Sequence, residues 1–340
     1  MVTSYRRDLF CCLALILQMI EVENLSKAYG SARAVQDVSF RVGKGEVLGF
    51  LGPNGAGKTT TMRILTCFMA PTAGTARIAG HDILEESLEV RRNIGYLPEN
   101  VPLYPEMSVR DYLNYVAALR GVPRNKRAER LEAALDAGKL EDRVDDLIHK
   151  LSKGYRQRVG IAQAVVHDPP VLILDEPSAG LDPRQRVETR QFIKSLSKDH
   201  TIILSTHILP DVQETCSRVV IINRGKIVAE DTPENLGATQ GRSDHITLLV
   251  HRPSGDAAHK LGQVQGVANV RRDGSQAEEQ ESRADEAREH TFLLDLEAGV
   301  DAREEVARLC VNEGWGLLEL RRERRSLEDV FLELTRTDEQ

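Results

Sequence analysis

A glycine-rich stretch near the start of the chain has the residue types and spacing that bind a polyphosphate. It matches the pattern G-x-x-x-x-G-K-[ST] without a mismatch. Its residues are Gly52, Pro53, Asn54, Gly55, Ala56, Gly57, Lys58, Thr59 and Thr60. The glycines allow successive backbone N–H groups to point inward around phosphate oxygens. We expect Lys58 to add a positive charge at the outer phosphates and Thr59 to offer a hydroxyl to Mg²⁺.

The neighbours of this loop predict the strand, turn and helix that the pattern requires. Residues 46–51 form a largely apolar run that is typical of a buried strand, and residues 60–65 are expected in the following helix. A helix N-terminus favours an anion because its free N–H groups and its dipole both face the bound group. A nucleotide phosphate site is therefore favoured over an accidental glycine-rich turn.

Two adjacent acids, Asp175 and Glu176, follow the apolar run that begins at Val171. Adjacent side chains on a strand diverge, so the two acids can take different roles. We expect Asp175 to face Mg²⁺ and Glu176 to face the attacking water as a general base. The alternative is that both acids merely end a strand at the solvent.

Three further positions are candidates for nucleotide contacts. Residues 201–207 form another apolar strand that ends in polar groups, and a histidine such as His207 can be structural or can bond a γ-phosphate. Tyr29 is either an ordinary turn aromatic or a ring that stacks on adenine. Ser152 is placed to cap a helix, and Gly154 beside it makes that helix start a weaker anion-site candidate.

Composition limits the other classes of function. The 340 residues are enough for two domains, and 29% charged with 41% hydrophobic residues is typical of a globular protein. The net charge of −7 gives no argument for a nucleic-acid partner, and none is expected. Five cysteines without a C-x-x-C pair argue against a disulfide framework or zinc cluster and fit a reducing compartment.

The N-terminal extension 1–18 leaves three interpretations open. Arg6 and Arg7 precede an apolar run that is too short to span a bilayer as a helix. The working protein could begin at Met19, the extension could be an additional packed or interfacial helix, or it could be a genuine signal. No other long apolar run occurs, so we do not expect the chain itself to cross a membrane.

The remaining pattern predicts two domains. Residues 19–235 are expected to form an α/β nucleotide-binding domain, with a helical insertion at about 100–150 where apolar residues recur three and four apart. Residues 236–340 show strands and helices in a βαββαβ order, which predicts a small ferredoxin-like α+β domain.

Taken together, the phosphate-binding loop, residues 151–158, the acid pair and His207 resemble the ATP-binding subunits of ABC transporters, across about residues 19–231. The resemblance implies a P-loop NTPase fold that binds ATP and Mg²⁺. It implies that Tyr29 stacks on adenine, that Lys58 and the loop amides hold the phosphates, and that His207 senses the γ-phosphate. It also implies that Thr59 and Asp175 serve Mg²⁺ and that Glu176 is the general base.

The same resemblance implies a second subunit. Ser152 and Gly154 would act on the ATP held by that subunit, with Asp182 at the seam between the two. The expected partners are a second copy of the chain and a separate ABC-2-type permease, at the cytoplasmic face of the membrane. The permease contact would involve the helical insertion and the loop after Glu99.

Two departures from the family pattern accompany the resemblance. Glu99 stands where glutamine is usual, and it can still reach Mg²⁺ but cannot donate a hydrogen bond when ionised. Lys153 and Tyr155 stand where glycine and glutamine are usual. These variants are similar to the ABC-2 exporter branch, and residues 99–107 are most similar to its gliding-motility type. The competing hypotheses are a soluble ABC-type ATPase acting on ribosomes or DNA, and a regulator that binds nucleotide without hydrolysing it.

Overall fold

The computed structural model describes residues 18–238, 245–272, 289–297, 300–323 and 327–335. The chain divides into two compact units, one formed by residues 1–233 with 334–340 and the other by residues 234–333. The three interpretations of the N-terminal extension concern residues outside the described ranges, apart from Gln18, where the first strand begins.

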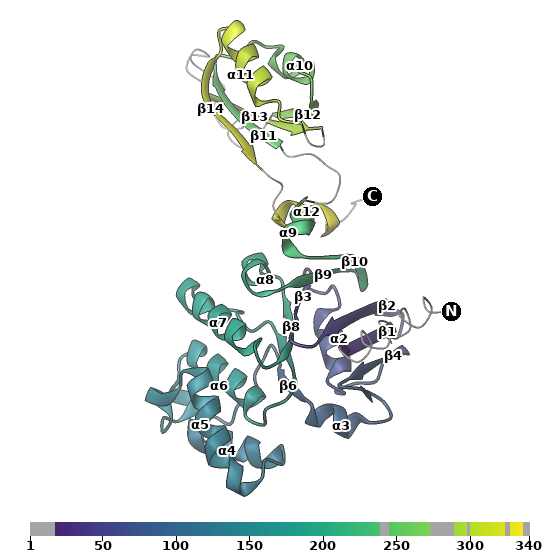
Figure 1. Ribbon diagram of the computed structural model, residues 1–340, viewed down its shortest axis with the longest axis vertical. Helices are drawn as coiled ribbons and strands as arrows, with labels where there is room; N and C mark the ends of the chain where they lie inside the picture. The colour runs from purple at the N-terminus through teal and green to yellow at the C-terminus, as the bar shows by residue number, and fades with distance from the viewer. Residues whose placement is uncertain (1–17, 239–244, 273–288, 298–299, 324–326, 336–340) are drawn as a thin grey trace, which may run out of the picture. The chain divides into compact units, whose positions relative to one another are not determined.

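A six-stranded sheet forms the centre of the first unit, with the strand order β10-β9-β3-β8-β7-β6 (Figure 1). The strands are β3 (Val47–Leu51), β6 (Ile94–Leu97), β7 (Val171–Asp175), β8 (Thr201–Thr206), β9 (Arg218–Asn223) and β10 (Lys226–Asp231). All neighbouring pairs are parallel except β9 with β10. These two strands form the hairpin that two apolar runs on either side of Arg224 and Gly225 predict.

The three central strands β3, β7 and β8 are buried along their whole length. Parallel strands that are covered on both faces read as continuous apolar runs, which is why the sequence marks them clearly. Leu51 pairs with Thr206, and Asp175 pairs with Ser205, so the strands end at nearly the same level. The loops that follow these strands therefore emerge at one edge of the sheet, where ligands of α/β proteins bind.

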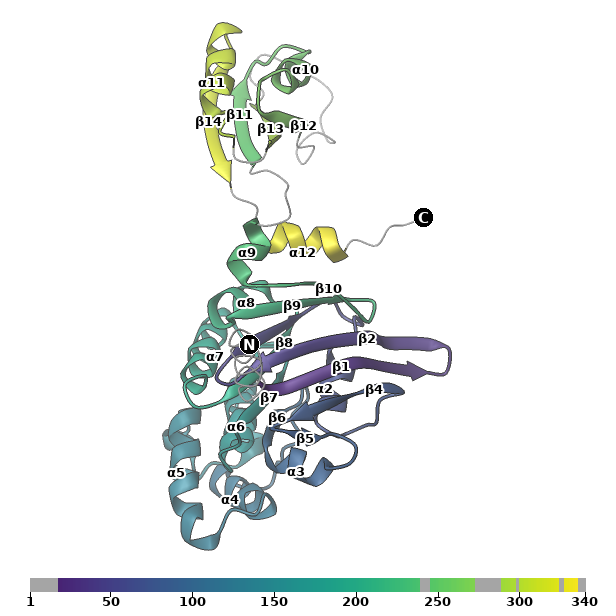
Figure 2. The same ribbon diagram turned by 45° about the vertical axis from the view of Figure 1, so that its right-hand side comes forward.

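An antiparallel sheet of order β2-β1-β4-β5 completes the core of this unit (Figure 2). Its strands are β1 (Gln18–Tyr29), β2 (Ala32–Gly43), β4 (Ala73–Ile78) and β5 (His81–Asp82). Apolar residues of this sheet pack in one cluster with the strand β3 and the helix α2 (Lys58–Leu65). The phosphate-binding loop is thus enclosed by well-packed elements on both sides.

Along the chain, a group of helices separates β6 from β7 (Figure 1). The apolar spacing over residues 108–148 predicts helices in this segment. They are α4 (Val109–Leu119), α5 (Arg127–Gly138) and α6 (Lys153–Val165), joined by short 3₁₀ turns at Arg124–Lys126, Glu141–Arg143 and Ile148–Lys150. Ser152 caps α6 by accepting a hydrogen bond from the Tyr155 backbone N–H at 3.3 Å. The other helices of this unit are α3 (Ser87–Arg92), α7 (Pro183–Leu196) and α8 (Leu209–Thr215).

The sequence pattern predicts a helix over residues 187–196, and the observed helix α7 begins four residues before Val187. The Asp182 side chain accepts a hydrogen bond from the Gln185 backbone N–H at 2.9 Å, and Pro183 occupies the first helical position. An aspartate cap followed by proline is a favourable helix start. The boundary was wrong because the first turn carries few apolar residues and its capping signal was overlooked.

The second unit contains an antiparallel sheet of order β12-β13-β11-β14. Its elements follow the βαββαβ order expected from the sequence: β11 (His245–His251), α10 (Ala257–Gly262), β12 (Val267–Arg272), β13 (Glu289–Leu296), α11 (Arg303–Asn312) and β14 (Gly316–Glu323). Both helices contribute side chains to one apolar cluster with the sheet. The short helices α9 (Pro233–Ala238) and α12 (Leu327–Thr335) flank these elements in the sequence.

Candidate nucleotide-binding site

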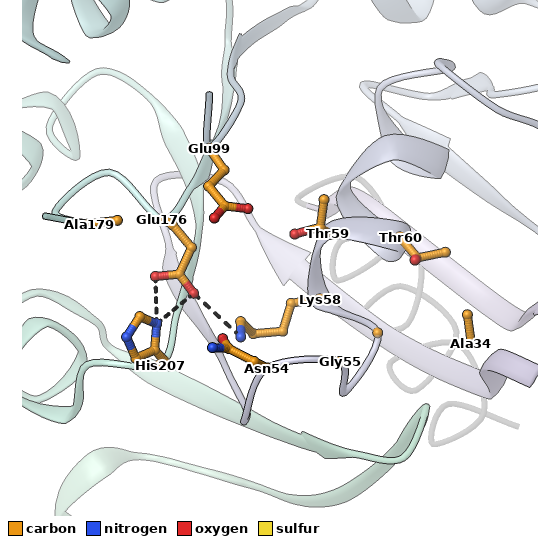
Figure 3. Close-up of a pocket in the computed structure, with 11 residues that line it drawn as sticks. Ala34, Asn54, Gly55, Lys58, Thr59, Thr60, Glu99, Glu176, Ala179 and His207 are labelled. Carbon is orange, nitrogen blue, oxygen red and sulfur yellow. Dashed lines mark hydrogen bonds and ion pairs between the residues drawn. The ribbon is translucent and has the colours of Figure 1, made fainter. Parts of the chain in front are cut away.

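A polar pocket of about 330 Å³ lies at the edge of the six-stranded sheet where β3, β7 and β8 end (Figure 3). Eleven residues line it: Ala34, Asn54, Gly55, Gly57, Lys58, Thr59, Thr60, Glu99, Glu176, Ala179 and His207. The structure therefore brings together the phosphate-binding loop, Glu99, the candidate base and the histidine, from separate parts of the chain.

The glycines of the loop are required by its backbone. Gly57 has φ 108°, and a Cβ there would collide with the carbonyl oxygen of Ala34 on β2. A Cβ at Gly52 would lie 2.5 Å from the carbonyl oxygen of Ile222 on β9. Because both obstacles are backbone atoms, no side chain can fit without moving a strand. The loop can therefore run close to the sheet and open α2 at Lys58.

Lys58 is buried at the centre of the pocket, with 5% of its surface exposed. Its Nζ donates a hydrogen bond to the Gly52 carbonyl oxygen at 2.8 Å and lies 3.4 Å from Glu176 Oε1. A lysine held in this way presents a fixed charge at the mouth of the loop. The ion pair also shows that Lys58 and Glu176 reach the same point, where a terminal phosphate would lie.

Glu176 lies directly after β7 in a left-handed conformation, with φ 51°. This conformation is unfavourable for a glutamate and is typical of a functional position. Its backbone N–H donates to the Ser205 carbonyl oxygen at 2.8 Å. His207 Nδ1 lies 2.9 Å and 3.0 Å from the two carboxylate oxygens (Figure 3). The carboxylate is thus held between Lys58 and His207, an arrangement that is compatible with the general-base role expected for Glu176.

Asp175 is completely buried, and neither of its carboxylate oxygens makes a hydrogen bond of standard geometry in the described part of the chain, although the hydroxyls of Ser205 and Thr59 lie close enough to affect its pKa. Burial raises the pKa of the Asp175 carboxyl, the hydroxyls of Ser205 and Thr59 lower it in part, and Glu176 and Glu99 raise it further. An unpaired buried acid is costly unless a cation compensates it. This donor set fits Mg²⁺.

No group of three or more His, Cys, Asp or Glu residues that could hold a metal occurs among the described residues. This does not conflict with a Mg²⁺ site, because Mg²⁺ is commonly held by one or two carboxylates together with substrate phosphates and water. Thr59 and Glu99 line the pocket and can complete such a site.

Replacing Asp175 with asparagine should raise the melting temperature of the nucleotide-free protein by a few degrees at pH 8. The raised pKa means that the native state binds a proton more readily than the unfolded state, so ionised Asp175 lowers the free energy of unfolding. The effect disappears below the ordinary aspartate pKa of about 4, where both states are protonated. Thermal melting of both proteins from pH 4 to pH 8 measures this. A difference in melting temperature between the two proteins that does not change with pH would contradict the raised pKa assigned to Asp175.

Seven residues expected at the nucleotide or its Mg²⁺ are not among those that line this pocket: Tyr29, Gly52, Pro53, Ala56, Ser152, Gly154 and Asp175. Tyr29 is about half exposed, and its hydroxyl lies 3.0 Å from Met69 Sδ. Ser152 and Gly154 lie at the start of α6, and Gly154 lines a separate pocket of about 250 Å³ with Asp182 and other residues. Their proposed roles remain predictions.

Two lining residues, Ala34 and Ala179, were missed by the sequence analysis. Ala34 lies on β2 and contributes through its backbone, which no side-chain pattern reveals. Ala179 lies in the short loop between Glu176 and Asp182. Its position between two candidate site residues could have indicated that it lines the pocket.

Comparison with known proteins identifies the class to which this fold and site belong. Residues 35–179 match the family model described as ABC transporter. The dimeric structure of a post-hydrolysis state of the ATP-binding cassette MJ0796, bound to ADP and Pi, matches with a TM-score of 0.58 and 25% identity, over 63% of this chain and 98% of that one.

Full-length relatives place the chain more closely. It is 33% identical over 317 residues to an uncharacterized ABC transporter ATP-binding protein, YxlF, of Bacillus subtilis (strain 168), covering 93% of this chain and 99% of that protein. It is 34% identical over 317 residues to the daunorubicin resistance ATP-binding protein DrrA2 of Streptomyces coeruleorubidus, covering 93% and 94%. The chain belongs to the ABC transporter ATP-binding proteins, and it is an ATPase subunit of this family.

Proposed function

We propose that this chain hydrolyses ATP as a dimer and thereby drives export by a separate ABC-2-type permease. The observation that carries the proposal is the placement of Glu176 between Lys58 and His207 at the end of the phosphate-binding pocket. Export is supported by the relative named for daunorubicin resistance. In this role the chain would be a peripheral protein at the cytoplasmic face of the membrane.

The chain's own residues account for the expected chemistry. The backbone amides of residues 52–60 and the Lys58 ammonium group would hold the ATP phosphates. Glu176 would accept a proton from the attacking water, while His207 keeps its carboxylate oriented. Thr59, Asp175 and Glu99 would hold Mg²⁺, which neutralises charge on the phosphates when it is bound.

Dimerisation is supported because two residues expected to contact ATP do not line the phosphate pocket. The start of α6, with Ser152 and Gly154, does not line the phosphate pocket of its own chain. A second copy could bring these residues to the ATP, with the Asp182 loop at the seam. The neighbouring MJ0796 structure is named as dimeric. An isologous contact between two copies would then complete two equivalent sites at once.

An exposed apolar surface on and beside α4 supports a protein partner. Tyr104 and Tyr115 are about half exposed, and their rings meet edge to face with centroids 5.6 Å apart. Leu119 follows Tyr115 by four residues on the same helix face and is 71% exposed. Clustered exposed aromatic and aliphatic side chains commonly mark an interface. This surface belongs to the helical insertion and to the loop after Glu99, where permease contact is expected.

Affinity purification from detergent-solubilised membranes tests the partner. We expect the parent chain to recover a multi-span permease, and the Leu119→Asp variant to lose roughly tenfold or more of it. The matched control is Val311→Asp on α11, because Val311 is also 71% exposed. Equal ATP affinity of the variants and the parent shows that the fold is intact. Recovery of ribosomes, or of the chain alone from the soluble fraction, would contradict the transporter proposal and favour a soluble ATPase.

The finer placement in the gliding-motility type rests only on the similarity of residues 99–107. The relatives compared above include a drug-resistance protein and do not show that type. The identity of the recovered permease tests it. In the part of the chain that the structure describes, no helix is both long and apolar enough to cross a membrane.

A further inference from the structure

A buried acid outside the pocket, Asp211, takes no direct part in the chemistry described so far. It lies in the first turn of α8, four residues after His207, and it is 1% exposed. Its backbone N–H donates to the Ile208 carbonyl oxygen at 3.2 Å, so the carboxylate is fixed to the segment that follows His207. An acid this deeply buried requires partners.

The partners of Asp211 come from two other elements near the site. Arg190, on α7, donates from Nη1 to Asp211 Oδ1 at 3.3 Å, and it is itself largely buried. Ser178, two residues after Glu176, lies close enough to lower the pKa of the same carboxyl group, although Ser178 Oγ and Asp211 Oδ2 make no hydrogen bond of standard geometry within the described residues. Arg186, also on α7, is a further nearby positive charge. Burial raises the pKa of Asp211, and Ser178, Arg190 and Arg186 lower it in part.

Asp211 is therefore the point where the loop after Glu176, the helix α7 and the start of α8 meet. The hydrogen bond between Glu176 and His207 joins two loops that follow different strands. The starts of these loops are tied to β8, because the Glu176 N–H donates to the Ser205 carbonyl oxygen at 2.8 Å and the Ile208 N–H donates to Thr206 Oγ1 at 3.0 Å.

The pair of Asp211 and Arg190 adds a restraint beyond these bonds. Arg190 also lies 3.2 Å from Glu214 Oε2, but the Glu214 side chain is well exposed, so this second pair is expected to restrain α8 little. The arrangement restrains the relative positions of the base and the histidine.

We propose that Asp211 and Arg190 are positioning residues for ATP hydrolysis, which hold the Glu176 loop and the His207 loop in the register that the reaction requires. The inference rests on the proposed roles of Glu176 and His207. It adds residues that touch neither the pocket nor the expected nucleotide. A small displacement of a reacting group can slow a reaction strongly even when substrate binding is unaffected.

The test is steady-state ATPase kinetics and ATP binding on the full chain with Asp211→Asn, which keeps the shape of the side chain and removes its charge. We expect kcat to fall about tenfold and the Kd for ATP to change less than about twofold. The matched control is Glu214→Gln, on the same helix and also paired with Arg190 but well exposed. It should keep kcat within about twofold of the parent.

A second readout separates positioning from general destabilisation. If Asp211 acts through the His207 loop, the double variant Asp211→Asn with His207→Ala should be about as slow as His207→Ala alone. Losses that multiply would overturn the proposal, as would an Asp211→Asn protein with kcat within about twofold of the parent. If Asp211→Asn does not fold, Ser178→Ala replaces it and should lower kcat about threefold. An unchanged kcat in Ser178→Ala would then overturn the proposal.

The two possible failures are distinguishable. A parent chain that folds and binds ATP but has no ATPase activity would contradict the proposed function and this inference together. An active parent with an equally active Asp211→Asn variant would contradict this inference alone.

Discussion

Replacing Glu176 with glutamine is expected to lower ATP turnover by about 10²- to 10⁴-fold. The glutamine keeps the size of the side chain and can still interact with His207, but an amide cannot accept a proton from water at neutral pH. Glu176 is 5% exposed, lies directly after β7 and is held between Lys58 and His207. ATP should therefore bind and remain bound, and the dimer should accumulate.

Single-turnover hydrolysis and size-exclusion chromatography with ATP measure the two parts of this prediction. The matched control is Glu132→Gln, an exposed position on α5 away from the pocket. Turnover equal to that of the parent would remove the role assigned to Glu176. A monomer that persists in saturating ATP would contradict the dimer instead.

Replacing Lys58 with methionine is expected to weaken ATP binding roughly 10- to 100-fold, because a hydrogen bond to a charged group contributes about 1.5–3 kcal/mol. Methionine retains most of the side-chain volume, so the change removes the charge and its hydrogen bonds rather than the packing. Lys58 is also the cation of its pair with Glu176, so turnover should fall further than binding does.

Fluorescence titration with ATP and with adenosine measures the Lys58 effect selectively. Adenosine has no phosphates, so its affinity should be the same in the variant and the parent. Lys198→Met, an exposed position after α7, is the control for the loss of one positive charge. Unchanged ATP affinity in Lys58→Met would show that the phosphates bind elsewhere.

The parts of the site that follow buried parallel strands could be predicted from the sequence. Strands β3, β7 and β8 are covered on both faces and read as continuous apolar runs, so the residues that follow them were located correctly. Their meeting at one edge follows from parallel pairing. The βαββαβ order of the second unit was also predicted, because β11 alternates between buried and partly exposed residues as a strand with one covered face does.

The parts that depend on distant packing could not be predicted. Ala34 lines the pocket because β2 passes close to Gly57, and this contact involves backbone atoms. Asp211 and Arg190 are separated by 21 residues, and neither has a spacing that would connect it to the site. Tyr29 was considered for adenine stacking from its residue type and from the family resemblance, and it is not among the residues that line the phosphate pocket.

In the proposed dimer, each catalytic site combines the phosphate pocket of one chain with the start of α6 from the other chain. Mixing two defective variants tests this most directly. Lys58→Met damages the phosphate pocket of its own chain. Gly154→Asp places a negative charge at the start of α6, where the atoms nearest to an added Cβ belong to the flexible Gln185 side chain. On this account each variant alone is nearly inactive.

In an equal mixture, half of the dimers contain one copy of each variant, and each such dimer has one intact site. The mixture should then recover about a quarter of the parent's ATPase activity, if chains exchange freely and the two sites act independently. Exchange can be verified with two affinity tags. Recovery to that level supports a shared site. A mixture that remains inactive despite verified exchange, or a Gly154→Asp chain that is fully active alone, would contradict the account.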